Sequence, residues 1–157
     1  MINILCNKGY IVTKSKISKE KLKSIKNDLK VKPFVKGNYG KTVKSFKVFI
    51  ENDKKIAIPK YYGIEKFGKA EYVDENIGED VNINFKGKLR DYQEKIIKIV
   101  YPKIQNEGGG LLSIPPGKGK TCLGIYIASL LKKKTLVIVH KTFLLNQWKE
   151  RIKQFSD

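Results

Sequence analysis

The residues with the clearest chemical potential lie in one glycine-rich segment of the chain. Residues 114–121 read Ile-Pro-Pro-Gly-Lys-Gly-Lys-Thr, a phosphate-binding loop in which Ile114 stands where the general pattern has glycine. Gly117 and Gly119 would let the backbone fold around a phosphate with its N–H groups pointing inward. A helix starting at Lys120 would add the positive end of its dipole. The segment therefore predicts nucleotide binding.

The side chains of this loop have distinct expected roles. Lys120 should reach the β- and γ-phosphates and the Thr121 hydroxyl should ligate Mg²⁺, so these two residues are also the expected catalytic residues. Pro116 and Cys122 complete the expected nucleotide-binding set. Lys118 has two interpretations, as a phosphate contact or as a solvated surface lysine. For the whole segment, the alternative is a glycine-rich turn that binds nothing.

A second candidate contact lies upstream, where Leu-Arg-Asp-Tyr-Gln ends at Gln93. A glutamine amide offers one donor and one acceptor, which matches the N6 and N7 edge of adenine. GTP presents the opposite pattern, so Gln93 favours ATP. Alone, Gln93 would be interpreted as an exposed helical glutamine, but in combination with the loop it indicates an adenine contact.

A third candidate site follows the apolar run at residues 135–139. Thr142 is a natural N-cap for the next helix, which would leave backbone N–H groups and Lys141 exposed. Ligands of open α/β sheets bind beyond the carboxyl ends of the strands, so Lys141 and Thr142 are candidates for contacting a nucleic-acid phosphate. Trp148 is expected to pack in the core rather than stack on a base, and His140 is expected to be structural rather than a metal ligand.

The elements around these residues indicate an α/β fold. Residues 111–114 and 135–139 are predicted to be apolar strands. Helices are predicted at residues 92–100, 120–131 and 143–155, with Pro102 kinking or ending the first. Continuous apolar strands that alternate with helices imply a parallel sheet covered on both faces.

The preceding part of the chain has a different organisation, which predicts a small α+β leader domain. Its expected elements are a hairpin at 2–6 and 10–13, a helix capped by Ser18, a loop at 37–40, a hairpin at 45–51 and 55–58, and a helix at 61–67 closed by Gly68. We expect a basic leader domain at 1–84, with an acidic connector near 70–88. The partial ATP-binding domain is expected at 85–157.

Charge is distributed unevenly along the 157 residues. The chain has 33 Lys+Arg against 15 Asp+Glu, a net charge of +18, and 31 of the cations are Lys. Residues 1–48 hold +11 and residues 89–157 hold +8, whereas residues 49–88 hold −1. The distribution favours a polyanionic partner, with a solvated Lys-rich surface as the alternative.

The remaining composition excludes several classes of protein. No apolar run is long enough to cross a membrane, and two cysteines make neither a disulfide scaffold nor a metal site. We therefore expect a soluble intracellular protein. A small-molecule kinase would need arginines for its lid, but only Arg90 and Arg151 are present. A GTPase would need an Asn-Lys-x-Asp guanine reader, which the sequence lacks.

Together, the three candidate segments resemble the first motor domain of superfamily 2 helicases. Residues 89–93 resemble the adenine-reading motif, residues 114–121 resemble motif I, and residues 136–148 resemble motif Ia, with the Leu-x-x-Gln-Trp ending typical of XPB- and UvsW-like members. Residues 58–68 resemble the leader domain of helicases from large DNA viruses, including the poxvirus transcript-release helicase. That likeness implies a viral protein, located in the host cytoplasm or the virion.

The resemblance implies an incomplete RecA-like, P-loop domain with a parallel sheet. In such helicases, ATP-Mg binds between two RecA-like domains, and motif Ia contacts the backbone of the DNA or RNA strand, with little sequence preference. The chain has no Asp-Glu-x-His or Asp-Glu-x-Asp sequence and no second RecA domain. We therefore expect the N-terminal portion of a helicase, truncated after motif Ia and not competent alone, whose C-terminal domains act in cis or in trans. The alternative is a non-catalytic nucleic-acid-binding remnant or accessory module with a vestigial loop.

Overall fold

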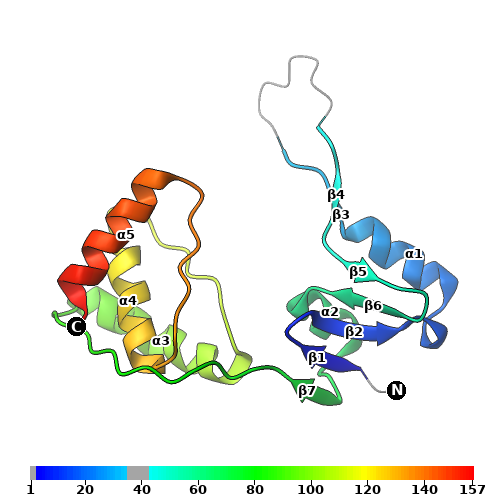
Figure 1. The fold of residues 1–157 in the computed structure, drawn as a ribbon, viewed down its shortest axis with the longest axis horizontal. Helices are drawn as coiled ribbons and strands as arrows, with labels where there is room; N and C mark the ends of the chain where they lie inside the picture. Colours follow the sequence, from blue (N-terminus) through cyan, green and yellow to red (C-terminus); the bar gives the residue numbers. More distant parts are fainter. Residues whose placement is uncertain (1–2, 35–42) are drawn as a thin grey trace. The chain divides into compact units, whose positions relative to one another are not determined.

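The computed structural model describes residues 3–34 and 43–157, which form two compact units (Figure 1). Unit 1 comprises residues 1–77 and unit 2 comprises residues 78–157. The predicted loop at 37–40 lies outside the described residues. Within the described ranges, no helix combines the length and the apolar character that a membrane span requires.

Unit 1 is built on a five-stranded sheet in the order β5-β6-β2-β1-β7. Its strands are β1 (Ile4–Cys6), β2 (Gly9–Thr13), β5 (Ile50–Glu51), β6 (Lys55–Ile58) and β7 (Tyr72–Asp74). Both predicted hairpins, β1–β2 and β5–β6, are confirmed. Strand β7 is paired in parallel with β1, although it falls inside the segment predicted to be a connector.

Two helices cover this sheet, α1 (Lys19–Asp28) and α2 (Lys60–Phe67). Ser18 caps α1 as predicted, because its hydroxyl accepts a hydrogen bond from the backbone N–H of Lys21 at 3.1 Å. The short 3₁₀ helix η1 (Lys14–Lys16) connects β2 to the start of this cap. Apolar side chains of the sheet and α1 form the core of unit 1: Leu5, Tyr10, Val12, Ile25, Leu29, Ile56 and Ile58.

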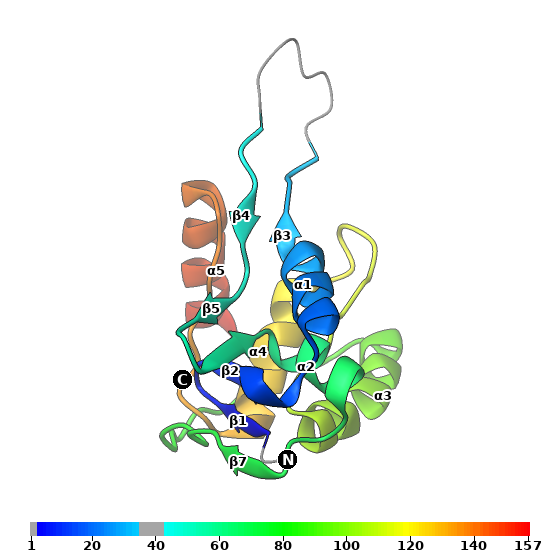
Figure 2. The ribbon, with the colours of Figure 1, turned by 90° about the vertical axis from the view of Figure 1, so that its right-hand side faces the viewer.

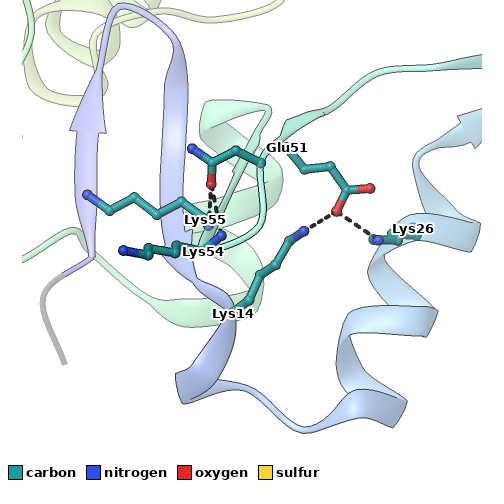
Figure 3. A network of polar contacts seen from close by, with 6 residues as sticks. Lys14, Lys26, Glu51, Lys54 and Lys55 are labelled. Atoms are coloured by element: carbon teal, nitrogen blue, oxygen red, sulfur yellow. Dashed lines mark hydrogen bonds and ion pairs between the residues drawn. The ribbon is translucent and has the colours of Figure 1, made fainter.

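One carboxylate links three elements of unit 1 (Figure 3). The Oε2 atom of Glu51 in β5 forms ion pairs with Nζ of Lys14 at 2.5 Å and with Nζ of Lys26 in α1 at 2.8 Å. These two lysines hold the pKa of the Glu51 carboxyl below its usual value. In the adjacent turn, the Asn52 amide oxygen accepts hydrogen bonds from the backbone N–H groups of the next two lysines along the β5–β6 connection.

A separate two-stranded ribbon rises from the sheet of unit 1 (Figures 1 and 2). It pairs β3 (Lys30–Val31) with β4 (Phe46–Lys47) in antiparallel register. The sequence pattern predicted one continuous strand at 45–51, which is wrong. The structure divides that segment between β4 and β5, because β4 pairs with β3 whereas β5 pairs with β6.

Unit 2 contains three helices, α3 (Asp91–Glu107), α4 (Lys120–Leu131) and α5 (Thr142–Phe155). Leu89, Ile97 and Leu123 form its buried core. Phe85 stacks on Phe155 with the ring centres 5.6 Å apart, which fastens the incoming chain to the end of α5. The α/β class is confirmed, because helices accompany a sheet that contains a parallel pair.

Two strands predicted for unit 2 are not formed in the structure. Residues 111–114 and 135–139 belong to no ladder among the described residues. The side chains of Leu136 and Ile138 are 83% and 85% exposed. An apolar run forms a strand only when a neighbouring strand satisfies its backbone groups, and unit 2 offers these two segments no such neighbour among the described residues.

The sequence predicted that Pro102 would kink or end this helix, and the structure shows that Pro102 does not end α3. The helix continues to Glu107 and ends at Gly108, which has the left-handed φ of 72° and donates its N–H to the Ile104 carbonyl. Proline removes the hydrogen bond to the carbonyl of Lys98, four residues earlier. Because Lys98 is exposed, water can satisfy that carbonyl.

The packing of unit 1 makes Gly63 of α2 intolerant of substitution. A methyl group there would lie 2.3 Å from Cγ of the fully buried Tyr10. We expect Gly63→Ala to destabilise unit 1 by about 1–3 kcal/mol, because overpacking outweighs the gain in helix propensity. Amide hydrogen exchange in β2 and β6 during urea titration measures this loss. Gly110→Ala is the matched control, since its methyl would meet no atom within 4 Å; equal stability of the two variants would refute the expectation.

Candidate nucleotide-binding site

The glycine-rich segment forms a tight loop that leads directly into α4. Gly117 and Gly119 have φ angles of 75° and 77°, the left-handed region that favours glycine. Gly119 caps α4, and its carbonyl accepts the backbone N–H of Leu123 at 3.0 Å. The first N–H groups of a helix have no partner within the helix. The loop therefore ends at a helix N-terminus, and the predicted helix start at Lys120 is confirmed.

Gln93, only 4% exposed, joins this loop to the start of α3. Its Oε1 accepts a hydrogen bond from the backbone N–H of Arg90 at 3.0 Å, and its Nε2 donates to the Lys118 carbonyl at 3.3 Å. The Tyr92 hydroxyl donates to the same carbonyl at 3.3 Å. The amide thus fixes the position of the loop relative to the helix.

The contact between Gln93 and the loop requires glycine at position 119. A Cβ atom on Gly119 would lie 2.4 Å from Nε2 of Gln93, closer than side chains approach one another. The positive φ at the same position adds a second restriction. Gly119 is therefore constrained by the backbone and by its neighbour together.

The Lys120 ammonium group lies within the loop itself. It donates to the carbonyl oxygens of Ile114 at 2.6 Å and Pro115 at 2.9 Å. These two bonds satisfy part of the ammonium's hydrogen-bonding capacity. To contact a phosphate, the Lys120 side chain would exchange the carbonyl oxygens for phosphate oxygens.

A cavity of about 590 Å³ opens beside the loop in unit 2. It is lined by Lys88, Arg90, Gln93, Pro116, Gly117, Gly119, Lys120, Thr121, Cys122, Gln147, Arg151 and Phe155. Apart from Lys118, every residue predicted to bind nucleotide contributes to this lining. The Lys118 ammonium instead lies 5.6 Å from the centre of the Tyr92 ring.

Sequence reasoning missed several residues of the cavity wall, notably Arg90 and Arg151. Arg90 precedes α3 and Arg151 lies on α5, 61 positions apart in the chain. The amino-acid composition could have indicated both residues, because arginine is rare in this chain. They are the only two arginines among 33 cations, and the structure places both beside the loop. Arginine binds phosphate through two parallel N–H groups, which lysine cannot do.

A second hollow of about 430 Å³ lies at the start of α5. Residues 137–142 and Leu145 line it, so the predicted nucleic-acid contacts Lys141 and Thr142 do lie together. The N-cap prediction is wrong by one residue: Lys141 is the cap, because its carbonyl accepts the N–H groups of Leu144 and Leu145. The Trp148 ring packs against Gly124 of α4, where an added Cβ would be 3.0 Å from its Cη2.

Comparison with known proteins agrees with this geometry. Residues 86–157 match the family described as the type III restriction enzyme, res subunit. This matched range contains the loop, the Gln93 contact and α5. Residues 86–157 thus resemble superfamily 2 helicases.

The relatives of this chain include viral and XPB-type proteins. "Putative ATP-dependent RNA helicase L396" of Acanthamoeba polyphaga mimivirus is 40% identical over 151 residues, covering 92% of this chain and 29% of the relative. "DNA 3'-5' translocase XPB2" of Sulfurisphaera tokodaii is 35% identical over 103 residues, 62% of this chain and 23% of the relative. "Putative helicase 161L" of Invertebrate iridescent virus 6 is 36% identical over 77 residues, 49% of this chain and 17% of the relative. The chain thus spans less than a third of each relative's length.

The environment of Cys122 gives the cavity a chemical reporter. Burial raises the pKa of its thiol above the ordinary value of 9.0, opposed by the nearby charges of Arg151 and Arg90. In a Cys6→Ser background, we expect the rate of alkylation by iodoacetamide to keep rising above pH 9, because the reactive thiolate forms only there. Arg151→Ala should slow alkylation further, whereas Lys153→Ala serves as the control. A rate that levels off below pH 9 would contradict this expectation.

Proposed function

We propose that the chain is the N-terminal portion of an ATP-dependent nucleic-acid helicase or translocase. The observation that carries this proposal is the loop that runs into α4 and is fixed by Gln93 beside the cavity. ATP binds there in this proposal. The translocated strand is DNA or RNA, since the relatives' names include an RNA helicase and a DNA translocase.

The loop residues divide the work of binding ATP-Mg. The N-terminal end of α4 and the N–H groups around Gly117 and Gly119 bind the phosphates. Lys120 leaves the Ile114 and Pro115 carbonyls and contacts the β- and γ-phosphates. The Thr121 hydroxyl ligates Mg²⁺, which supplies charge neutralisation when bound. Pro116, Lys118 and Cys122 complete the binding set.

Gln93 can contact adenine without giving up its structural bonds. Its amide nitrogen has two hydrogens and its oxygen two lone pairs, and the contacts in the structure use one of each. One donor and one acceptor are left, the number that the N6 and N7 edge of adenine requires. Arg90 and Arg151 add positive charge to the same cavity.

The nucleic-acid backbone binds at a different place, the hollow before α5. Lys141 supplies a cation and Thr142 begins the helix, so backbone N–H groups there are free to meet a phosphate. The basic leader, unit 1, adds further phosphate contacts.

The acids that activate water would come from further helicase domains, in cis or in trans, because the sequence has no Asp-Glu-x-His or Asp-Glu-x-Asp. Two relatives are viral proteins, and we propose a viral origin for this chain also.

An accessory role is the second candidate. In that case the leader binds nucleic acid through its charge and the loop is vestigial. The sequence feature that favours it is the net charge of +11 on residues 1–48. Nucleotide binding separates the two candidates, because only a working loop would depend on Lys120.

Lys120→Ala tests ATP binding directly. We expect at least a ten-fold loss of affinity for a fluorescent, non-hydrolysable ATP analogue in the presence of Mg²⁺, because the variant loses its charged phosphate contact. Fluorescence anisotropy measures the affinity, and circular dichroism confirms that the variant is folded. Lys149→Ala, which removes an exposed lysine from α5, is the matched control. Equally poor binding by the wild-type chain and Lys120→Ala would favour the accessory role.

Lys141→Ala tests the second contact. We expect weaker binding of a labelled oligonucleotide and a less steep salt dependence, with the slope of log K against log salt falling by about 0.7 for one lost single-strand phosphate contact. ATP-analogue affinity should not change, because Lys141 does not line the nucleotide cavity. Lys149→Ala again controls for charge. An unchanged slope would refute the assignment of Lys141.

A further inference from the structure

The ribbon of unit 1 has an unusual combination of side chains. We define the basic ribbon as residues 30–34 and 43–47, which contain β3, β4 and the residues beside them. It holds four lysines and no Asp or Glu: Lys30, Lys32, Lys44 and Lys47. Among the described residues, none of these lysines forms an ion pair. The positive charge of the basic ribbon is therefore uncompensated.

The basic ribbon also exposes aromatic rings. Phe34 is 91% exposed and Phe46 is 50% exposed. A large apolar side chain gains stability by leaving water, so two exposed rings on one short ribbon indicate a surface with a partner. In the antiparallel register, Val31 pairs with Phe46 and Lys30 pairs with Lys47. Apolar and cationic side chains thus occupy alternate faces of the paired residues.

The basic ribbon is fixed to unit 1 at its base. Leu29, which immediately precedes β3, is buried in the core. Its carbonyl accepts the N–H of Val48, just after β4, at 2.9 Å, and Phe49 packs against the same core. Figures 1 and 2 show β3 and β4 leaving the body of unit 1 from this point. The described side chains of the ribbon are consequently presented away from the core.

We propose that the basic ribbon binds single-stranded nucleic acid, with bases stacked on Phe34 and Phe46 and phosphates contacted by its lysines. This inference rests on the proposed function and names a surface for it in unit 1. Lysines fit a polyanion, and aromatic rings fit the faces of unpaired bases, which a duplex keeps stacked on one another. The ribbon has no arginine, asparagine or glutamine to read a base edge. Binding there is sequence-tolerant.

A ring-removing variant tests the stacking. In the full chain, Phe34→Leu combined with Phe46→Leu keeps apolar side chains but removes both rings. We expect binding of labelled oligothymidylate to weaken at least five-fold, as measured by anisotropy, with an unchanged salt slope. Tyr72→Leu removes a ring that is 57% exposed on β7 and serves as the control. Circular dichroism verifies that both variants are folded.

A charge-removing variant tests the phosphate contacts. Lys32→Gln combined with Lys44→Gln should lower the salt slope by about 1.4, the value for two single-strand phosphates. Lys54→Gln combined with Lys55→Gln removes the same charge from the β5–β6 turn and the start of β6, where both residues are exposed. We expect a smaller change in this control pair. Equal changes in the two pairs would show that total charge, and not the ribbon, governs binding.

Other outcomes distinguish failure of the ribbon from failure of the proposed function. If the double phenylalanine variant binds like the wild-type chain while Lys141→Ala weakens binding, the ribbon proposal is overturned and the helicase proposal stands. Equal competition by blunt duplex DNA would also overturn it, because stacking requires unpaired bases. If the wild-type chain binds no oligonucleotide but binds polyglutamate or anionic vesicles, both proposals fail.

Discussion

The buried amide of Gln93 is the interaction that holds the glycine-rich loop in place. It accepts the Arg90 N–H and donates to the Lys118 carbonyl, so the start of α3 and the loop before α4 are held in one arrangement. An unpaired amide in this position would cost about 1–3 kcal/mol. The two hydrogen bonds of Gln93 therefore favour the observed arrangement of helix and loop. Gly119 is constrained by the same contact, because any side chain there would collide with the Gln93 nitrogen. The loop geometry and the adenine contact that we propose therefore depend on the same side chain.

Two surfaces are proposed to bind nucleic acid, the hollow before α5 and the basic ribbon. They differ from the rest of the chain in where their charges lie more than in how many charges they have. The lysine run after α4 looks like an anion-binding cluster, but Lys133 pairs with Asp80 at 2.6 Å and Lys134 pairs with Glu79 at 2.9 Å. Lys132 donates to the Ile83 carbonyl at 2.6 Å. These contacts fasten the acidic segment to the end of α4. By contrast, the lysines of the basic ribbon have no acid beside them in the sequence.

Short sequence patterns correctly predicted those structural features that depend only on residues close together in the chain. Ser18, the glycines of the loop and the amphipathic spacing of α1 and α5 specified their elements because each acts within a few residues. Strand β7 could not be predicted in this way, because it exists only through its pairing with β1, 68 positions earlier in the register. The wall residues Arg90 and Arg151 were missed for the same reason. Their proximity is a product of helix packing and not of spacing.

The same distinction explains why the loop is formed although its flanking strands are not. Residues 111–114 and 135–139 have the composition of buried strands but no ladder partner among the described residues. A strand requires a second strand, whereas the loop is held by two left-handed glycines, the start of α4 and the Gln93 amide. The phosphate binding that we propose requires only the loop, the start of α4 and the Gln93 amide, because its contacts would be backbone N–H groups and the Lys120 ammonium. The geometry that the proposed nucleotide site needs can therefore form in this chain independently of a completed sheet.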